Sequence, residues 1–373
     1  MKLPLFYKDD LSALRASGRY RSLSLAAGWD FSSNDYLALA GSAELAGAAR
    51  AAIDRGVPLG SGGSRLLRGN GEEHERLETA AAEFFGSECA LFVGSGFAAN
   101  TMLLATLPQK DDIVFYDELV HASAHEGMKL SRAPRAAFRH NDVQAAADAI
   151  RQWRESGNLG TPWIAFETLY SMDGDCAPLA DFAALADRES AMLLIDEAHA
   201  VGVCGNRGRG LAADLQGREN AIVLATCGKA LGCEGALVLV PETIRDFLIN
   251  RGRSFIFSTA PSPLMAAVLH SALDIVAGAD DRRERLRALV GTARKVFDPL
   301  GIAASGSHIQ PIIIGDDRRT MELAKHLQHQ GFDIRGIRPP TVPPGTARLR
   351  VSITLNTSAE AIAELGTILE DLL

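Results

Sequence analysis

The residues of this sequence best suited to chemistry follow three short apolar runs. Asp196 and His199 come at the end of MLLID, Thr226 and Lys229 follow IVLAT, and the turn Ser95-Gly96-Phe97 follows ALFVG. A glycine-rich turn that opens a helix offers backbone N–H groups to a phosphate. A carboxylate can pair with a protonated ring nitrogen, and a lysine amine can form a Schiff base with an aldehyde. Together these groups suit pyridoxal phosphate.

The letters DEAH at 196–199 also form a helicase signature, which suggests a different chemistry. An ATPase needs a phosphate loop of the form GxxxxGK[ST]. The Gly-Lys pair at 228–229 is followed by Ala230, and position 223 is Val, so this loop is absent from the sequence. The formal net charge is −8, and no basic stripe that could face a nucleic acid is visible. We therefore expect neither a helicase nor a nucleic-acid partner.

A second alternative is a dinucleotide site at residues 94–99. This stretch, GSGFAA, follows an apolar run and fits the pattern GxGxxG/A, and Asp117 ends the next run 117 − 96 = 21 positions after Gly96. An acidic residue at about this spacing binds the ribose of NAD in dinucleotide folds. The motif alone indicates a phosphate and does not identify which one. An NAD-dependent oxidoreductase, colourless and retaining nicotinamide, therefore stays open.

The elements that must position these residues form an α/β pattern. Seven runs read as buried strands with helical stretches between most of them. They are 90–94, 113–116, 136–140, 163–168, 192–196, 222–226 and 236–240. Most are apolar throughout, as expected for strands covered on both faces. We predict a mainly parallel sheet whose functional residues lie at the carboxyl ends of its strands.

The rest of the 373 residues suggests three parts. We expect an N-terminal arm over 1–42, a large α/β domain over 43–279 and a small C-terminal α+β domain over 280–373. The first ten residues lack the apolar core of a signal peptide, and no apolar run is long enough to span a bilayer. The five cysteines are scattered, with no CxxC pair. These features predict a cytoplasmic enzyme with reduced thiols, no membrane association and no metal site.

The order of motifs along the chain adds a resemblance. The chain resembles the α-oxoamine synthase family of pyridoxal-phosphate enzymes, which have the transferase architecture called fold type I. The motifs that carry it are GRYRSL (18–23), SSNDYL (32–37), GSGGSRLLRGN (60–70), GSGFAAN (94–100), HAS (121–123), SMDGD (171–175), IDEAHAVGVCGNRGRG (195–210), TCGKALG (226–232), FSTAPSP (257–263) and IRPPTVPPGTARLR (337–350). Each motif alone is weak, but together and in this order they are specific and span nearly the whole chain.

The resemblance implies roles for the residues that match these motifs. Lys229 would bind the cofactor covalently and act as acid and base, Asp196 would pair with the pyridine nitrogen, and His121 would stack on the ring. These three are the expected catalytic residues. The residues expected to hold the cofactor are Gly96, Phe97, His121, Ser171, Asp196, His199, Thr226, Lys229, Ser258 and Thr259.

Within the cofactor set, Ser171 and His199 would contact the phenolic oxygen of the ring. Gly96, Phe97 and Thr226 would bind the phosphate. Ser258 and Thr259 would reach the phosphate of a neighbouring subunit in a homodimer with shared active sites.

The resemblance also implies a substrate set. Asn34 and Arg338 would hold the amino acid's carboxylate, Arg21 and Thr341 would contact the acyl substrate, and His121 also belongs to this set.

The chain looks most like the biotin-pathway branch of the family. That branch condenses L-alanine with a pimeloyl thioester, on coenzyme A or an acyl carrier protein, and releases carbon dioxide. The alternatives are a sister synthase that uses glycine or serine with another acyl-CoA, an aminotransferase, or a non-catalytic scaffold. The sequence departs from the family pattern at Ala38, where many relatives have glycine, and at Cys233-Glu234, where small or apolar residues are usual.

Overall fold

The computed structural model describes residues 4–373, so the first three residues of the expected arm lie outside it. By their contacts the residues form two compact units. The larger unit comprises 37–170 and 176–283, and the smaller unit comprises the N-terminal residues to 36, 171–175 and 284–373. The functional division into arm, large domain and small domain stays a prediction.

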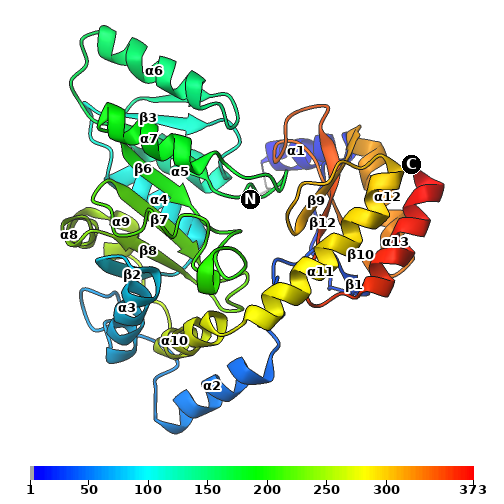
Figure 1. The fold of residues 1–373 in the computed structure, drawn as a ribbon, viewed down its shortest axis with the longest axis horizontal. Coiled ribbons are helices and arrows are strands. Elements are labelled where there is room, and N and C mark those ends of the chain that lie inside the picture. Colours follow the sequence, from blue (N-terminus) through cyan, green and yellow to red (C-terminus); the bar gives the residue numbers. More distant parts are fainter. Residues whose placement is uncertain (1–3) are drawn as a thin grey trace. The chain divides into compact units, whose positions relative to one another are not determined.

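The larger unit is built on a seven-stranded sheet in the order β2-β8-β7-β6-β5-β3-β4 (Figure 1). Its strands are β2 (Cys89–Val93), β3 (Ile113–Asp117), β4 (Arg135–Phe138), β5 (Pro162–Glu167), β6 (Met192–Asp196), β7 (Ala221–Thr226) and β8 (Ala236–Val240). From β4 to β7 the neighbouring strands run parallel, while β8 pairs antiparallel with both β7 and β2. All seven predicted strands and the mainly parallel α/β sheet are confirmed.

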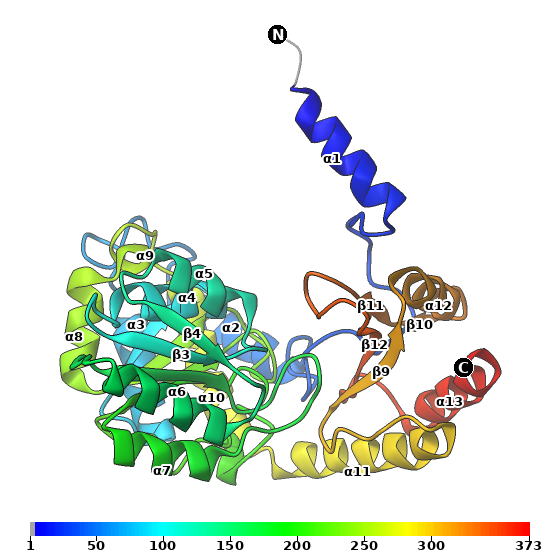
Figure 2. The same cartoon turned by 90° about the horizontal axis from the view of Figure 1, so that it is seen from above.

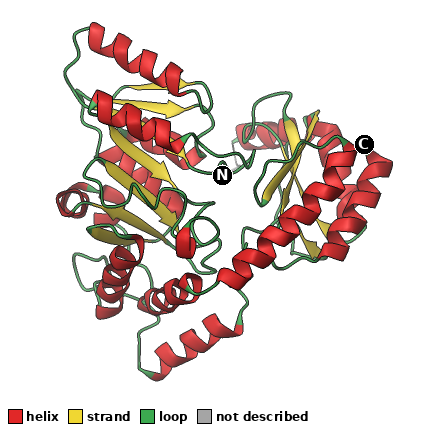
Figure 3. Cartoon of the chain, in the orientation of Figure 1, coloured by secondary structure: helices red, strands yellow, loops and turns green. Residues whose placement is uncertain are grey.

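Helices cover both faces of this sheet, as expected for strands without a polar face (Figure 3). The helices of this unit are α2 (Ala43–Asp54), α3 (Glu72–Phe85), α4 (Gly96–Thr106), α5 (Ala122–Leu130), α6 (Val143–Glu155), α7 (Leu179–Glu189), α8 (Glu242–Arg251), α9 (Arg253–Ile256) and α10 (Pro263–Ala277). Figure 2 shows α4 and α5 on one side of the sheet and α6 and α7 on the other.

Each face has its own apolar core. Leu194, Leu224 and Val238 from the strands pack with Leu103 of α4 and Met128 of α5. On the opposite face, Phe182 of α7 stacks on Phe166 of β5 with ring centroids 4.6 Å apart. A strand residue therefore faces either α4 and α5 or α7, according to the face of the sheet on which its side chain lies.

Among its described residues, the smaller unit contains two small sheets and four α-helices. The strands β1 (Trp29–Asp30) and β10 (Phe332–Asp333) pair in parallel, and a second sheet has the order β11-β12-β9, with β9 (Ile309–Gly315), β11 (Arg335–Ile337) and β12 (Ala347–Ser352). The helices are α1 (Leu5–Ala16), α11 (Asp280–Phe297), which continues from the larger unit, α12 (Asp317–His329) and α13 (Ala359–Leu372). No described helix is by itself long and apolar enough to cross a membrane. Among the described helices, one pair, α10 and α11 with a bend of 70° between them, has the length and composition of a membrane span when the two are taken together.

Ala38 adopts a backbone conformation that favours glycine, with a φ of 51°. A left-handed conformation costs an L-residue about 1–2 kcal/mol, whereas glycine adopts it freely but loses about 0.5–1 kcal/mol more entropy on folding. We therefore expect Ala38→Gly to raise the free energy of unfolding by about 0.5–1 kcal/mol. Urea unfolding would measure this.

The matched control is Ala51→Gly, at an exposed position inside α2. There glycine should lower the free energy of unfolding by about 1 kcal/mol, because helical φ gives it no advantage. A loss of stability of the same size at position 38 would contradict the argument.

Candidate active site

The alternation of side chains along the strands aims the predicted site residues at one helix. In β6, Leu194 belongs to the core shared with α4, and Asp196, two residues later, points to the same face. In β7 the same holds for Leu224 and Thr226. The parallel strands end at the same edge, so both polar side chains meet the first turns of α4.

Asp196 is held by two N–H donors at this edge. The Nδ2 of Asn100, on α4, donates to Oδ2 at 2.7 Å, and the backbone N–H of Ala198 donates to Oδ1 at 2.9 Å. The two bonds fix the orientation of the carboxylate at the end of β6. A carboxylate at this place can pair with a cationic ring nitrogen.

Lys229 lies in the loop after β7, and its amine reaches the neighbouring strand end. The Nζ of Lys229 donates to the Nε2 of His199 at 2.7 Å, and His199 is buried. The amine therefore lies beside the strand that carries Asp196. The structure brings these three predicted residues together.

The start of α4 forms a cradle for a small anion. The side chain of Ser95 caps the helix by accepting from the N–H of Ala98 at 3.1 Å. A Cβ added to Gly96 would lie 3.2 Å from Oγ1 of Thr226, so a larger residue would crowd this space. The first N–H groups of a helix have no partner within the helix. Gly96, Phe97 and Thr226 thus surround a place suited to a phosphate.

His121 caps α5 (Ala122–Leu130) and lies close to Asp196 and Lys229. Its Nδ1 is 2.8 Å from Oγ of Ser123 and accepts from the Ser123 N–H at 3.2 Å. The ring stays partly open to solvent, but the protein atoms around it lower its pKa below the ordinary value. Asp196 opposes that shift and Lys229 adds to it. His121 is therefore mainly neutral near pH 7.

Glu197, next to Asp196, does not join this group. It is fully buried, accepts a short hydrogen bond from the hydroxyl of Thr168 and a second from the N–H of Leu211 at 3.2 Å. Burial raises the pKa of Glu197 to about 7. Of the acidic pair in DEAH, only Asp196 lies in the candidate site.

Asp117, the residue that the dinucleotide hypothesis needs at a ribose, has another role. It is fully buried and accepts from the N–H groups of Leu119 at 2.9 Å and Asn141 at 2.7 Å, while Nδ1 of His140 lies 3.0 Å from Oδ1. Burial alone would raise its pKa, but these hydrogen bonds keep the pKa of Asp117 below its ordinary value. Asp117 therefore fixes the loop after β4, and the dinucleotide hypothesis loses its acidic residue.

Ser258 and Thr259 are exposed in the loop after α9 and do not contact the cradle in this chain. The backbone holds their loop beside residues 59–63, because the N–H of Ala260 donates to the carbonyl of Gly63 at 2.8 Å and Ser262 Oγ donates to Leu59 at 2.7 Å. Glu234, one of the two departures from the family pattern, is exposed.

In the smaller unit, Asn34 and Ser171 share one arginine. The guanidinium of Arg350, on β12, donates to Oδ1 of Asn34 at 3.1 Å and to the carbonyl of Ser171 at 2.6 Å. Arg350 is buried, so it fixes both residues firmly. Arg350 therefore positions one predicted substrate residue and one predicted cofactor residue.

The other residues predicted to bind substrates lie near one another in the smaller unit. Arg21 donates to Oγ1 of Thr341 at 3.2 Å, and Arg338, which is buried, donates to the carbonyl of Tyr20 at 3.0 Å. The Nε of Arg338 is buried with no hydrogen-bond partner. Burial lowers the pKa of Arg338, and the nearby charge of Arg21 adds to the shift. Two close guanidinium groups with an unused N–H suit an anionic group.

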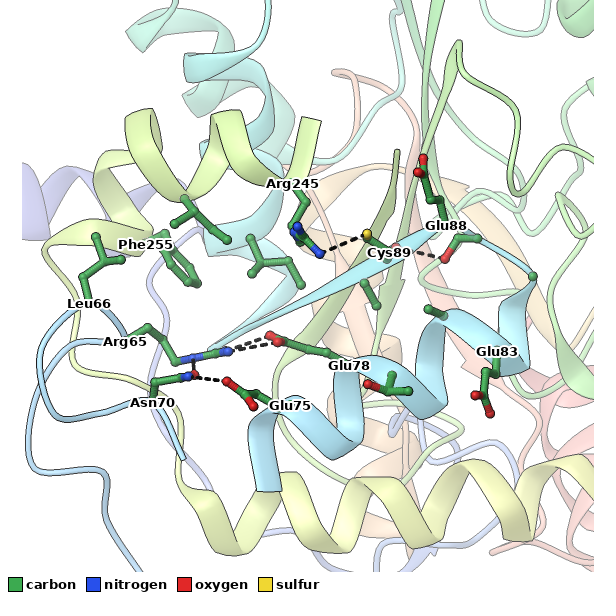
Figure 4. A pocket seen from close by; sticks show the side chains of 17 residues that line it. Arg65, Leu66, Asn70, Glu75, Glu78, Glu83, Glu88, Cys89, Arg245 and Phe255 are labelled. Carbon is green, nitrogen blue, oxygen red and sulfur yellow. Dashed lines mark hydrogen bonds and ion pairs between the residues drawn. The ribbon is translucent and has the colours of Figure 1, made fainter. Parts of the chain in front are cut away.

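A cavity of about 880 Å³ in the larger unit lies elsewhere (Figure 4). Both of its arginines have partners: Arg65 forms a two-point ion pair with Glu78 at 2.7 and 2.9 Å and donates to Asn70 at 2.6 Å, and Arg245 donates to Cys89 Sγ at 3.2 Å. None of the predicted site residues lines it. The candidate site is therefore the group of predicted side chains at the strand ends, and not this cavity.

Sequence reasoning missed Asn100, Ser123 and Arg350. All three lie inside motifs that it quoted, GSGFAAN, HAS and GTARLR, but their partners are far away in the sequence. Asn100 and Asp196 are 96 positions apart, and Arg350 and Asn34 are 316 apart. For Asn100, the available signal was an asparagine among the mainly apolar residues that follow the glycine turn.

Known proteins share this architecture and sequence. The model of the family "Aminotransferase class I and II" matches residues 28–366. The chain is 42% identical over 327 residues to the 8-amino-7-oxononanoate synthase of Chromobacterium violaceum, covering 87% of this chain and 84% of that one. Among solved structures, the 8-amino-7-oxononanoate synthase of Francisella tularensis is 27% identical with a TM-score of 0.78, covering 92% and 97% of the two chains. A Sphingomonas wittichii serine palmitoyltransferase is 26% identical with a TM-score of 0.86, covering 99% and 96%.

Proposed function

The chain belongs to the aminotransferase class I and II family and, within it, to the 8-amino-7-oxononanoate synthases, and from this premise we propose what its site does. It condenses L-alanine with a pimeloyl thioester, releasing the thiol and carbon dioxide and forming 8-amino-7-oxononanoate for biotin biosynthesis. The observation that carries the proposal is the grouping of Lys229, Asp196 and His121 beside the cradle at Gly96. The cytoplasm, where the five free cysteines would stay reduced, is the compartment we propose.

Pyridoxal phosphate fits these residues. Its phosphate would lie in the cradle of Gly96, Phe97 and Thr226, and its ring between His121 and the strand ends, with Asp196 at the pyridine nitrogen. When bound, the cofactor supplies an aldehyde that takes up an amine and a ring that withdraws electrons from the carbon attached to it.

The chain's own residues supply the rest. The Lys229 amine would hold the aldehyde of the cofactor, and the same amine would move the proton at Cα of the amino acid. Asp196, whose carboxylate is oriented by Asn100 and Ala198, would pair with the ring nitrogen of the cofactor. His199, 2.7 Å from Lys229, positions the amine. His199 would also contact the phenolic oxygen of the ring.

Arg338 would bind the carboxylate of L-alanine together with Asn34, while Arg21 and Thr341 contact the pimeloyl chain. A buried guanidinium with an unused Nε–H is ready for a two-point hydrogen bond to a carboxylate. Hydrogen bonds to charged groups contribute about 1.5–3 kcal/mol.

We therefore expect Arg338→Ala to raise KM for alanine about 10- to 150-fold and to leave KM for the thioester nearly unchanged. Steady-state kinetics with each substrate varied in turn would measure both constants. Arg318→Ala, on α12, is the matched control for losing a positive charge. Equal increases in both KM values would contradict the assignment.

We also propose a homodimer with shared active sites. Leu59, Leu67 and Phe257 are more than two-thirds exposed, on two segments that hydrogen bonds hold side by side. A second copy of the chain would cover this apolar surface and bring Ser258 and Thr259 to the partner's phosphate. Sedimentation of the cofactor-loaded protein tests the dimer, and a mass near 39.8 kDa would contradict it.

The deciding experiment is an absorbance spectrum before and after adding L-alanine, glycine or L-serine, followed by thiol release on adding pimeloyl-CoA or the pimeloyl acyl carrier protein. A visible band that responds most to alanine, with thiol release, supports the proposal. A preference for glycine or serine would move the chain to a sister activity, and amino transfer to a 2-oxo acid without thiol release would favour an aminotransferase. No band after incubation with pyridoxal phosphate would overturn the proposal.

A further inference from the structure

A chain of hydrogen bonds links Asp196 to His121 through two residues with no assigned role. Asn100 Nδ2 donates to Oδ2 of Asp196 at 2.7 Å and lies 3.0 Å from Oγ of Ser123, which in turn lies 2.8 Å from Nδ1 of His121. Asn100 and Ser123 are both buried. The chain joins β6 to the first turns of α4 and α5.

The close packing of α4 against α5 makes this series of hydrogen bonds possible. Gly127 of α5 faces α4, where an added Cβ would lie 2.8 Å from Cβ of Leu104 and 2.9 Å from the carbonyl oxygen of Asn100. Any larger residue would push the helices apart. Glycine at this position lets the amide of Asn100 reach the hydroxyl of Ser123.

In each of these hydrogen bonds only one assignment of donor and acceptor is possible. Asp196 accepts, so the amide nitrogen of Asn100 must face it, since the amide oxygen would repel the carboxylate. The second N–H of the same nitrogen then points to Ser123, whose oxygen accepts it. The single hydroxyl proton of Ser123 is left for Nδ1 of His121, which also accepts the Ser123 backbone N–H.

We infer that Asn100 and Ser123 are positioning residues that fix His121 as the neutral tautomer with its proton on Nε2 and tie the orientation of its ring to Asp196. A ligand beside the ring would then meet a donor at Nε2 and not an acceptor. The hydrogen-bond chain itself needs no ligand. Its importance for turnover rests on the proposed function.

Nitrogen NMR of the cofactor-loaded protein, labelled with ¹⁵N-histidine, tests the tautomer directly, and a His121→Gln variant identifies the signal. We expect Nε2 of His121 to carry the proton. In Ser123→Ala and Asn100→Ala the signal should move toward a mixture of tautomers, because one donor to Nδ1 is lost or misdirected. Thr101→Val removes a hydroxyl one residue along α4 whose described bond is 3.5 Å, to the carbonyl of Ser123, and should leave the signal unchanged.

Kinetics give a second readout. We expect Ser123→Ala to lower kcat about tenfold with little change in either KM, as for other residues that orient a catalytic group. The groups that act on the His121 charge are Asp196 on β6, Lys229 after β7 and, on its own helix, His125. Losing a donor to Nδ1 makes ring protonation easier, so the acid limb of the pH–rate profile should move to higher pH. Ser123→Cys, which keeps a weak donor, should recover part of kcat.

The outcomes separate the two proposals. A protein that binds the cofactor and releases thiol with alanine, but carries the His121 proton on Nδ1, would overturn this inference and leave the proposed function intact. A protein that binds no cofactor would overturn the proposed function, while the tautomer can still be read from its NMR signal. A His121 tautomer that is unchanged in both Ser123→Ala and Asn100→Ala would also overturn the inference. If a variant fails to fold, the position of the His121 proton in the wild type still tests the inference.

Discussion

Lys229→Ala should abolish turnover, with kcat falling by at least about 10³-fold, because one amine both binds the cofactor and moves the Cα proton. Its surroundings in the structure suit that double role. The Nζ lies 2.7 Å from Nε2 of the buried His199, which holds the amine beside the end of β6. The cradle at Gly96 and Thr226 does not involve Lys229, so the variant should still take up pyridoxal phosphate, without a covalent bond.

Borohydride treatment followed by peptide mass spectrometry measures the covalent bond. The wild type should carry the cofactor on the peptide that contains Lys229, and the variant should release it on denaturation. Lys129→Ala is the matched control, because Lys129 lies exposed on α5 and pairs with Glu126 at 2.6 Å. Cofactor found on another lysine of the wild type, or full turnover in Lys229→Ala, would contradict the assignment. A small added amine should restore part of the lost rate.

The fold was largely predictable from the sequence because its strands are buried on both faces. Continuous apolar runs bounded by polar turns locate β2 to β8 within a residue or two, and the rule that parallel sheets carry function at their carboxyl ends places Asp196, Thr226 and Lys229. Side chains alternate between the two faces of the sheet, so the position of each residue in its strand determines which helices it faces. Asp196 is two residues from Leu194 and therefore faces α4 as Leu194 does.

The same alternation explains what was not predicted. Asp117 ends β3 one residue after Tyr116, whose side chain packs on the α4 face, so Asp117 points the other way. Spacing of 21 residues from Gly96 could not reveal that. Glu197 belongs to the DEAH sequence, but its side chain is buried in the core and accepts a hydrogen bond from Thr168. Asn100 and Ser123 needed the packing of α4 on α5, which depends on a contact at Gly127 that no local pattern encodes.

Asp196→Asn should lower kcat by at least about 10²-fold while changing the affinity for pyridoxal phosphate much less. The change keeps the shape of the side chain and removes its charge, and with it the reason for the ring nitrogen to stay protonated. The phosphate cradle, which does not depend on Asp196, should keep most of the binding. Titration of the cofactor and measurement of kcat would separate the two effects. Asp148→Asn on α6, an exposed loss of the same charge, is the matched control.

The loss of charge must be told apart from the loss of a hydrogen bond, because the amide introduced by Asp196→Asn can present its N–H₂ to that of Asn100. A swap variant, Asp196→Asn with Asn100→Asp, restores a donor–acceptor pair between the two positions but moves the negative charge from β6 to α4. If the charge must stand at the end of β6, the swap variant should remain as slow as Asp196→Asn alone. Recovery of turnover in the swap would show that the bond between the two residues matters and the position of the carboxylate does not. Unchanged turnover in the single variant would remove Asp196 from the mechanism altogether.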